Sequence, residues 1–503
     1  MRDKNRIFSP AICAVFSLAF ITALSLTVYL SIWLIEISLA LAYTLYGLKV
    51  LFCLLLISSQ LNERTKTSLV FLSLIMPCLI IPFYLVFRQK RIGKKEKAFI
   101  EYLESQKPKS EQFESKMSFK CKHIFAYMRN LAGIPNTQLY KNTSAEYFSE
   151  AKDMLSSLTK DLEKARTFIF LEFYIVASGE AFENILSILK RKAKSGVDVR
   201  IIYDGIGSLF RIPTGLMRIM KESGIRAVSH RSFSLKFPGS INNRNHRKIA
   251  VIDGECAYTG GINLADEYIH SRARLGRWKD SAVRISGEGV NALTYTFLSD
   301  FAFLSASRES FSKYYRYRKK KCDGAAIIFS DGPQNIYREK SAKKIIISML
   351  DSAERKFIFT TPYLICDDEV FTSVRNAAMR GVKVIAILPK TPDKYLVSLL
   401  SHRYAERIST AGAEVYLYSP GFLHSKSYLC DEKFLMIGTV NLDNRSLCHN
   451  FENGVLFSEH NVISEARADL DSILSESEPY EENKEGPLLR LICSALEIFA
   501  PLL

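Results

Sequence analysis

The stretch His246–Asp253, with the sequence His-Arg-Lys-Ile-Ala-Val-Ile-Asp, returns in the same frame as His424–Asp431, with the sequence His-Ser-Lys-Ser-Tyr-Leu-Cys-Asp. Each copy is followed at the same offset by an asparagine, Asn263 or Asn441. The chain holds only eight histidines, so two such strings with matching asparagines exceed what background residue frequencies predict. We infer an internal duplication whose two halves build one composite active site.

The residues around each copy repeat as well. An apolar, β-prone run comes first, at 167–175 in one half and 356–365 in the other. An amphipathic helical pattern follows and ends at a glycine, and a second apolar run covers 196–203 or 381–388. This is the order of a βαβ unit. It predicts an α/β fold of two duplicated α/β sandwich units, each with a largely parallel sheet covered by helices.

The N-terminal region is strongly apolar. Between Pro10 and Ser59 the only charged residues are Glu36 and Lys49, and a second apolar run spans Thr67–Phe87. About 20 apolar residues cross a bilayer core as a helix. A cleaved signal peptide would have a shorter apolar core and a small-residue cleavage site, and neither is found. We expect a transmembrane anchor over 1–90, with helices near 11–34, 37–57 and 67–87.

Positive charge suggests on which side of the membrane the rest of the chain lies. A basic cluster at 88–97 follows the last expected span, and such clusters favour the cytoplasmic side. The basic residues at 2–6 favour the same side for the N-terminus, which an odd number of spans does not allow. The larger cluster decides our expectation of a multi-pass protein of the cell membrane with a cytoplasmic catalytic region.

The net charge of +16 indicates what kind of partner the protein meets. It fits contact with the anionic lipid leaflet better than contact with nucleic acid, because the chain is tethered to a membrane. The sequence predicts anionic phospholipid as the partner and no nucleic acid.

Composition divides the chain into five segments. The anchor over 1–90 is followed by a basic connector over 91–144 and by the two halves, 145–310 and 325–475. The apolar C-terminal stretch 476–503 predicts an interfacial helix, in preference to a helix packed on the domain.

Strand geometry separates the residues of each motif into two groups. Alternate side chains of a strand share a face, so the histidine and the lysine of each copy point together. Asp253 lies an odd number of residues from His246 and about 23 Å further along, at 3.3 Å per residue. We therefore expect Asp253 and its counterpart Asp431 to support the structure. The paired residues are His246 with Lys248 and His424 with Lys426.

A tight-hairpin signal, Asp253-Gly254, separates two apolar runs. A two-residue turn there sets position 261 opposite the histidine and returns Asn263 to its side. The spacing thus gathers a histidine, a lysine, a small residue and an asparagine at one end of each hairpin. In the second copy the corresponding residues are Asp431-Glu432, Thr439 and Asn441.

The gathered side chains suit chemistry at a phosphodiester. Ammonium and amide groups can hold its non-bridging oxygens. One neutral imidazole can attack phosphorus while the other, protonated, gives its proton to the departing alcohol. Because the lysines neutralise the charge, we expect neither a metal nor another cofactor. Asp280 and Glu452 are the candidates to orient the second ring nitrogen of each histidine, unless either is only an ion-pair partner.

These residues resemble the phospholipase D superfamily and, more narrowly, its bacterial cardiolipin synthase branch. The resemblance covers nearly the whole chain and includes the apolar N-terminus, the string Trp278–Asp280 and the Pro-Leu-Leu ending. Its main carriers are the strings Asn243–Ile249 with Tyr258–Asn263, and Leu423–Lys426 with Ile437–Ser446.

The resemblance implies an enzyme that exchanges a phosphatidyl group through a phosphohistidine, so that two phosphatidylglycerol molecules give cardiolipin and glycerol. It implies His246 as the nucleophile and His424 as the acid, which the near-symmetric sequence does not distinguish. It also counts Asp253 and Asp431 with the catalytic residues, although strand geometry argues for support. The strand around Glu172 matches the family only in part, so the role of Glu172 stays open.

Rival functions could use the same double motif. One is a phospholipase D or another phosphatidyltransferase with a different acceptor alcohol, and another is a membrane-tethered nuclease. A lipid-binding protein without activity is a third. The apolar spans argue against the nuclease, and the complete pairs of histidine, lysine and asparagine argue against an inactive protein. The acceptor alcohol and the oligomeric state stay open.

Overall fold

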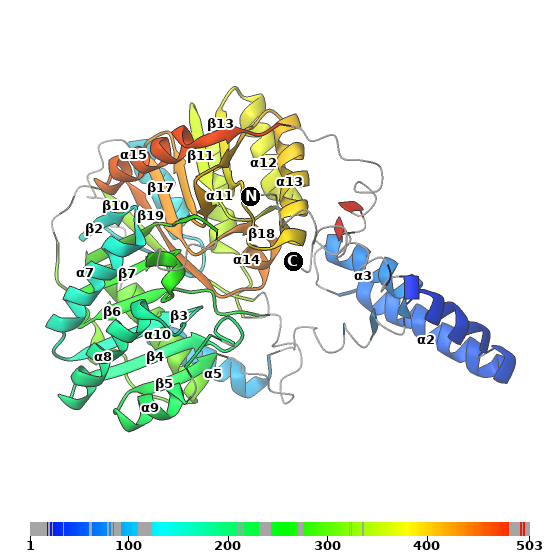
Figure 1. Cartoon of the computed structure of the whole chain (residues 1–503), viewed down its shortest axis with the longest axis horizontal. Coiled ribbons are helices and arrows are strands. Elements are labelled where there is room, and N and C mark those ends of the chain that lie inside the picture. Colours follow the sequence, from blue (N-terminus) through cyan, green and yellow to red (C-terminus); the bar gives the residue numbers. More distant parts are fainter. Residues whose placement is uncertain are drawn as a thin grey trace.

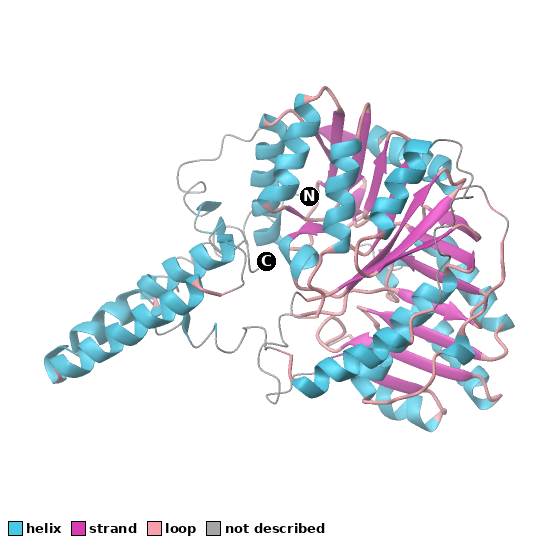
Figure 2. Ribbon diagram, turned by 180° about the vertical axis from the view of Figure 1, so that it is seen from behind, coloured by secondary structure: helices cyan, strands magenta, loops and turns pink. Residues whose placement is uncertain are grey.

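The computed structural model describes residues 92–108, 122–230, 243–269, 275–320 and 324–481 with short gaps, much of 18–84, and part of 493–497. The globular body contains two large mixed β-sheets with helices packed on them (Figure 1, Figure 2). Each half of the duplicated sequence supplies most of one sheet.

The first half forms a seven-stranded sheet in the order β2-β9-β7-β6-β3-β4-β5. Its strands are β2 Thr143–Phe148, β3 Phe168–Phe173, β4 Asp198–Asp204, β5 Arg226–His230, β6 Ile249–Ile252, β7 Cys256–Gly260 and β9 Ala282–Gly287.

The second half forms a nine-stranded sheet in the order β1-β10-β19-β17-β16-β11-β13-β14-β20. Its strands are β1 Thr137–Tyr140, β10 Ala325–Asp331, β11 Lys356–Thr360, β13 Lys383–Pro389, β14 Glu414–Tyr418, β16 Ser427–Cys430, β17 Phe434–Gly438, β19 Glu452–Ser458 and β20 Ser477–Pro479.

The two sheets share one strand order, which confirms the duplication. The run β9-β7-β6-β3-β4-β5 in one sheet corresponds to β19-β17-β16-β11-β13-β14 in the other. The expectation that the sheets are largely parallel is wrong, however. Among the described strands of these two sheets, only the pairs β3–β4 and β4–β5, and β11–β13 and β13–β14, run parallel. The βαβ units account for these pairs, whereas the hairpins that carry the repeated motif make their neighbours antiparallel.

Three apolar clusters hold the body together. The central cluster joins side chains of both sheets, such as Val251 and Val455, to the helices α10 Val290–Ser305 and α15 Val462–Ser475. The outer face of the first sheet is covered by α7 Ala151–Lys164, α8 Glu180–Lys194 and α9 Leu216–Glu222. The outer face of the second is covered by α11 Ser341–Ser352, α12 Asp368–Met379 and α13 Tyr395–Thr410. The halves therefore share a core.

The expected connector over 91–144 is in part a folded element of the body, which corrects its boundary. The helix α5 Lys94–Ser105 places Leu103 in the central cluster. The helix α6 Lys122–Ala132 places Met128 in the cluster of the second half, and β1 is an edge strand of that half's sheet. Apolar residues spaced along a basic segment made this packing hard to recognise in the sequence.

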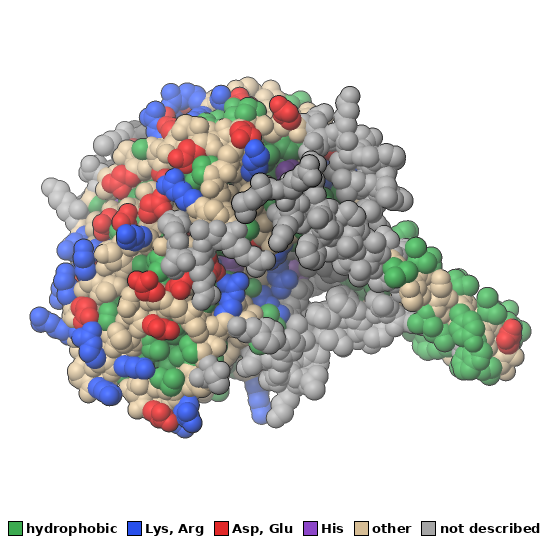
Figure 3. Space-filling view, viewed as in Figure 1, with side chains coloured by type: hydrophobic (Ala, Val, Ile, Leu, Met, Phe, Trp, Pro, Cys, Tyr) green, Lys and Arg blue, Asp and Glu red, His purple; other side chains and the backbone are tan. Residues whose placement is uncertain are grey.

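The N-terminal helices project away from the body (Figure 1). α2 Leu39–Ile57 packs beside α3 Glu63–Ile75 through Leu56 and Leu72, and its apolar side chains cover the projecting rod (Figure 3). Among the described residues, α2 alone is long and apolar enough to cross a membrane. The helices expected near 11–34 and 67–87 extend into residues outside the described part of the chain.

The C-terminal segment packs on the second half where it is described, which corrects the expected interfacial helix. β20 pairs antiparallel with β14 within the expected range 476–503. Cys493 and Leu496 are buried in the cluster of the second half, and Arg403 Nε lies 2.8 Å from Glu497 Oε1. Apolar composition alone does not distinguish a helix on a lipid surface from one on a protein core.

The two motif hairpins turn through three residues rather than two. Ile252 pairs with Cys256, and Cys430 pairs with Phe434. Extending this register sets position 246 opposite 262, one residue away from the expected partner. Asp253 has a φ of 54° and Gly254 a φ of 69°, so the left-handed region accommodates the extra residue.

The motif aspartates lie at the far ends of the hairpins, where they anchor a neighbouring strand. Asp253 accepts from the backbone N–H of Arg166, Thr167 and Phe168 at 2.7, 2.7 and 2.8 Å. Asp431 accepts from the backbone N–H groups of residues 354–356 at 2.8–2.9 Å. These contacts do not support a catalytic role for the two aspartates. They agree with the structural role that strand geometry predicts.

We predict that Asp253→Asn destabilises the fold by about 1–3 kcal/mol, because three backbone donors lose their carboxylate. Burial alone would raise the pKa of Asp253, but Thr167 and the backbone N–H of Phe168 lower it. Its contribution is therefore present above the ordinary pKa of an aspartate and is lost as the pH falls through the lowered value. Denaturant unfolding of the wild type and the variant at pH 7 and pH 3 measures both effects.

The matched control is Glu255→Gln, which removes a charge from the same turn. Glu255 is exposed and pairs with Arg318 at 2.9 Å on the surface. Its loss should change the free energy of unfolding by less than about 1 kcal/mol. Equal destabilisation by the two variants would refute the anchoring role.

Candidate active site

The two histidines are positioned by backbone contacts between the halves. The strand β15 Gly421–Leu423 pairs parallel with β8 Arg277–Lys279, and the backbone N–H of His424 donates to the carbonyl of Lys279 at 2.7 Å. The N–H of His246 donates to the carbonyl of Phe451 at 2.9 Å. The backbone of each histidine is therefore held by a hydrogen bond to the main chain of the opposite half.

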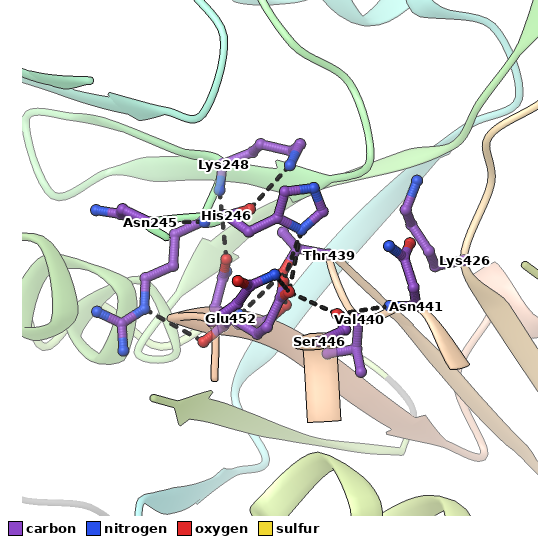
Figure 4. A network of polar contacts seen from close by, with 12 residues as sticks. Asn245, His246, Lys248, Lys426, Thr439, Val440, Asn441, Ser446 and Glu452 are labelled. Atoms are coloured by element: carbon purple, nitrogen blue, oxygen red, sulfur yellow. Dashed lines mark hydrogen bonds and ion pairs between the residues drawn. The ribbon is translucent and has the colours of Figure 1, made fainter. Parts of the chain in front are cut away.

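His246 receives its carboxylate from the second half. Its Nδ1 lies 2.9 Å from Glu452 Oε2 and 3.1 Å from Oε1 (Figure 4). Glu452 begins β19 and is fully buried. Three further side chains donate to this carboxylate: Ser446 Oγ at 2.5 Å, Asn450 Nδ2 at 3.1 Å and Thr439 Oγ1. This set of donors fixes the carboxylate and with it the orientation of the imidazole.

His424 receives its carboxylate from the first half. Its Nδ1 lies 2.6 Å from Oδ2 of Asp280, which is also fully buried. The hydroxyl of Tyr268 and Nζ of Lys426 approach the same ring nitrogen at 3.3 and 2.8 Å. The orienting role expected of Asp280 and Glu452 thus matches the geometry, and the exchange of partners between the halves is new.

The lysines lie with their histidines. Lys248 Nζ donates to the carbonyl of His246 at 2.8 Å, and Lys426 Nζ donates to the carbonyl of His424. Burial and the charge of Lys426 lower the pKa of Lys248 to about 7, although Glu452 opposes the shift. Burial also lowers the pKa of Lys426 to about 8, while Asp280 opposes that shift. The two carboxylates, Glu452 and Asp280, therefore face two lysines whose charged forms are disfavoured by burial.

The same environment keeps the imidazoles neutral. Burial lowers the pKa of His246 to about 4, although Glu452 opposes the shift. Burial and then Lys426 and Lys248 hold the pKa of His424 well below its ordinary value. Burial raises the pKa of Asp280 to about 6, although the charge of Lys426 opposes this shift. An anion bound at this site would favour the protonated form of all four basic groups.

The two asparagines are buried but take different partners. Asn263 Nδ2 donates to the hydroxyl of Tyr268 at 2.8 Å, and its Oδ1 accepts from the N–H of Ile175 at 3.1 Å. Asn263 is thus tied through Tyr268 to His424, the histidine of the other half. Asn441 Nδ2 donates to Asp443 Oδ2 at 3.1 Å, and Figure 4 shows Asn441 beside Lys426.

A second network supports His246 from behind, and sequence reasoning assigned its members no clear role. Asn245 Nδ2 donates to Glu172 Oε1 at 2.5 Å. Arg247 is fully buried and ion-pairs with Asp300, while its Nε donates to the carbonyl of Glu452 at 3.2 Å. Burial and then Asp300 raise the pKa of Glu172 well above its ordinary value. Glu172 therefore holds the segment that carries the histidine.

The arrangement provides what a two-step displacement at phosphorus needs. Because Nδ1 of each imidazole faces a carboxylate, Nε2 is the ring nitrogen left to face a substrate. The four basic groups lie close enough to lower one another's pKa, and Asn441 lies beside Lys426 (Figure 4). Among the described residues, no group of three or more histidine, cysteine, aspartate or glutamate side chains is arranged to hold a metal ion.

Comparison with known families gives one match. The family model described as "Cardiolipin synthase, PLD-like domain" matches residues 158–285 and 346–474, where PLD denotes phospholipase D. The matched segments contain both motif hairpins and both orienting carboxylates.

Relatives and solved structures agree with that match. A cardiolipin synthase of Alkalihalophilus pseudofirmus is 32% identical over 518 residues, covering 99% of this chain and 100% of that protein. A cardiolipin synthase of Halalkalibacterium halodurans is 33% identical over 414 residues, covering 80% and 81%. The crystal structure of a phosphatidylserine synthase from Haemophilus influenzae superposes with a TM-score of 0.57 at 15% identity, covering 75% of this chain and 97% of that one, which shows a shared fold.

We predict that the imidazole of His246 is neutral at pH 7 and gains a proton only near pH 4. The side-chain ¹⁵N resonances of the histidine-labelled protein measure this titration, and the spectrum of His246→Ala assigns the signal. Glu452→Gln should lower the pKa further, because the carboxylate favours the imidazolium. A value near 6.5 in the wild type, or a rise in the variant, would contradict the geometry of the pair.

Proposed function

Because the chain belongs to the cardiolipin synthase family of phospholipase D-like proteins, we propose that it joins two phosphatidylglycerol molecules into cardiolipin and glycerol. The observation that carries the proposal is the exchanged pair of carboxylates, His246 with Glu452 and His424 with Asp280. It presents two oriented imidazoles to one anionic substrate. The acting residues are protein side chains, and no cofactor enters the scheme.

In the first step, Nε2 of His246 attacks phosphorus of the donor lipid. Glu452 keeps the proton on Nδ1, so that Nε2 offers its lone pair. Lys248, Lys426 and Asn441 hold the negative charge that gathers on the non-bridging oxygens. The P–N bond forms and the P–O bond to glycerol breaks. Nε2 of His424, which is protonated when the anionic substrate is bound, gives its proton to the leaving oxygen.

In the second step, His424 reverses its role. Its Nε2 takes the proton from the hydroxyl of a second phosphatidylglycerol, whose oxygen attacks phosphorus while the P–N bond breaks. His246 returns to its neutral state. The phosphatidyl group stays activated between the steps, so no nucleotide is consumed.

Different surroundings support different roles for the two histidines. Burial alone would raise the pKa of Glu452, but His246, Lys248 and Ser446 hold it below its ordinary value. A carboxylate kept ionised suits the orientation of a nucleophile. His424 instead contacts Asp280 and Lys426, whose pKa values of about 6 and about 8 lie close to neutral pH. This favours His424 as the group that exchanges protons with the alcohols.

We place the catalytic region at the cytoplasmic face of the cell membrane, behind about three N-terminal spans. The exposed apolar surface of α2 and the basic cluster at 88–97 support this placement. An interfacial site favours a lipid acceptor over water. A fluorescent or alkaline phosphatase reporter fused after residue 503 tests the side, since an active phosphatase fusion would place the C-terminus outside.

We predict that purified protein releases glycerol and forms cardiolipin from phosphatidylglycerol vesicles in the presence of EDTA and without nucleotide. Thin-layer chromatography of radiolabelled lipid measures both products. Formation of phosphatidic acid alone would instead indicate a hydrolytic phospholipase D. Products only with another alcohol would indicate a different phosphatidyltransferase, and cleavage of single-stranded DNA a nuclease.

The matched controls are His246→Ala and His424→Ala. Both should abolish cardiolipin formation, but only His424→Ala should still trap labelled phosphatidyl on the protein, because the nucleophile remains. Glu452→Gln and Asp280→Asn should each lower kcat by about 10²- to 10⁴-fold, since a misoriented imidazole loses its acid–base function. Label recovered on a residue other than histidine would overturn the mechanism.

A further inference from the structure

A small pocket with polar and apolar walls lies in the second half, and Phe422 separates it from His424. The segments that follow the parallel strands β11 and β13 line it, and Phe422 of β15 forms part of its wall. Tyr363, Asp393 and Lys394 are among its polar side chains. Ligands of open α/β sheets bind at this edge, outside the carboxyl ends of the parallel strands.

Three of these side chains form a linked set. The hydroxyl of Tyr363 donates to Asp393 Oδ2 at 2.6 Å. Lys394 Nζ donates to the hydroxyl of Tyr363 at 3.1 Å and lies 3.9 Å from Asp393. Asp393 and Lys394 are 22% and 61% exposed, so they reach solvent within the pocket. An ionised carboxylate has about four acceptor positions, which leaves Asp393 able to accept from a ligand as well.

The wall of the pocket contacts the catalytic groups through Phe422. The ring of Phe422 lies 5.8 Å from the ring of His424. Burial and Lys426 are the main causes of the lowered pKa of His424, and the charge of Lys394 adds to them. Burial lowers the pKa of Lys426, whereas Asp280, Glu452 and Asp393 raise it. The set therefore acts on the histidine that exchanges protons with the alcohols.

The corresponding edge of the first half treats its carboxylate differently. Asp204 ends β4, the counterpart of β13, and is fully buried. It accepts from the backbone N–H groups of Ile206, Gly207 and Asn245 at 2.9, 2.8 and 2.9 Å. Asp204 is thus committed to the main chain, while Asp393 stays accessible. Of these two carboxylates, Asp393 is the accessible one, and it lies in the half that contains His424.

We propose that Tyr363, Asp393 and Lys394 form the acceptor subsite and select an alcohol of the glycerol type. Asp393 accepts a hydrogen bond from the hydroxyl of the acceptor that does not attack phosphorus. Lys394 faces the phosphate of the acceptor lipid. The inference rests on the proposed function, because it names how that reaction recognises its second substrate.

The subsite acts in the second step. The primary hydroxyl oxygen of the acceptor forms the new bond to phosphorus, the P–N bond to His246 breaks, and the hydroxyl proton passes to Nε2 of His424. Holding a neighbouring hydroxyl beside His424 fixes the position of the attacking one. Water and simple alcohols lack that second hydroxyl, so they gain nothing from Asp393.

The test separates donor from acceptor. Full-length protein in mixed micelles receives phosphatidyl-p-nitrophenol as the donor, with glycerol and 1-propanol as competing acceptors. Release of p-nitrophenol reports attack on the donor, and the ratio of phosphatidylglycerol to phosphatidylpropanol reports selection of the acceptor. Asp393→Ala should lower that ratio about tenfold or more, since a hydrogen bond to a charged group is lost. Tyr363→Phe should lower it less.

A second variant and a control keep the outcome decisive. Asp393→Asn keeps the size of the side chain and should also lower the ratio, even if Asp393→Ala folds poorly. Asp471→Asn removes an exposed carboxylate of α15 that pairs with Lys356 and Arg467, and should not change the ratio. An unchanged ratio in both Asp393 variants would overturn the subsite, even if the yields with both acceptors fell equally.

Lys394 is tested with the acceptor that carries a phosphate. Lys394→Gln should raise the KM for phosphatidylglycerol as acceptor several-fold more than the KM for free glycerol, and equal effects would overturn its assignment. The same assays isolate the parent proposal. Wild-type protein that releases p-nitrophenol but forms no cardiolipin contradicts the proposed function, while the acceptor ratio of the variants still decides the subsite.

Discussion

Each imidazole of this protein takes its orienting carboxylate from the opposite half of the chain, and the rest of the site depends on that exchange. Glu452 and Asp280 must each sit within hydrogen-bond distance of a ring nitrogen across the boundary between the halves. A hydrogen bond weakens steeply with small displacements, so the halves cannot shift against one another. The shared apolar core and the backbone contacts at Phe451 and Lys279 supply that rigidity. Duplication here produced one site rather than two.

The exchange also organises the charge. Two unit charges 4 Å apart interact by about 4 kcal/mol at an effective dielectric constant of 20. Lys248 and Lys426 therefore make each other less stable as cations, and both carry a lowered pKa. Glu452 and Asp280 offset only part of this repulsion. A bound anion would favour the protonated lysines and imidazoles, so anion binding and the protonation state of this site are linked.

The sequence predicted the parts of this site that repeat and missed those that cross between repeats. Periodicity identified the duplication, and strand alternation placed His246 beside Lys248 and turned Asp253 away. It could not show which half supplies each carboxylate, because spacing along one hairpin says nothing about its partner. The turn register was wrong by one residue, since left-handed φ values at Asp253 and Gly254 allow a longer turn. The role of Glu172 emerged only from its contact with Asn245.

A symmetric fold that performs an asymmetric reaction must break its symmetry somewhere. The strand order of the two halves is the same, and so is the placement of histidine and lysine. The differences lie around those groups. Glu452 takes hydrogen bonds from several side chains, whereas Asp280 faces an imidazole that Lys426 also contacts. Asp204 is buried and accepts hydrogen bonds from the main chain, whereas Asp393 remains accessible. Under the proposed function, these differences assign the nucleophile to one half and leave the other half room for the alcohols that leave and enter.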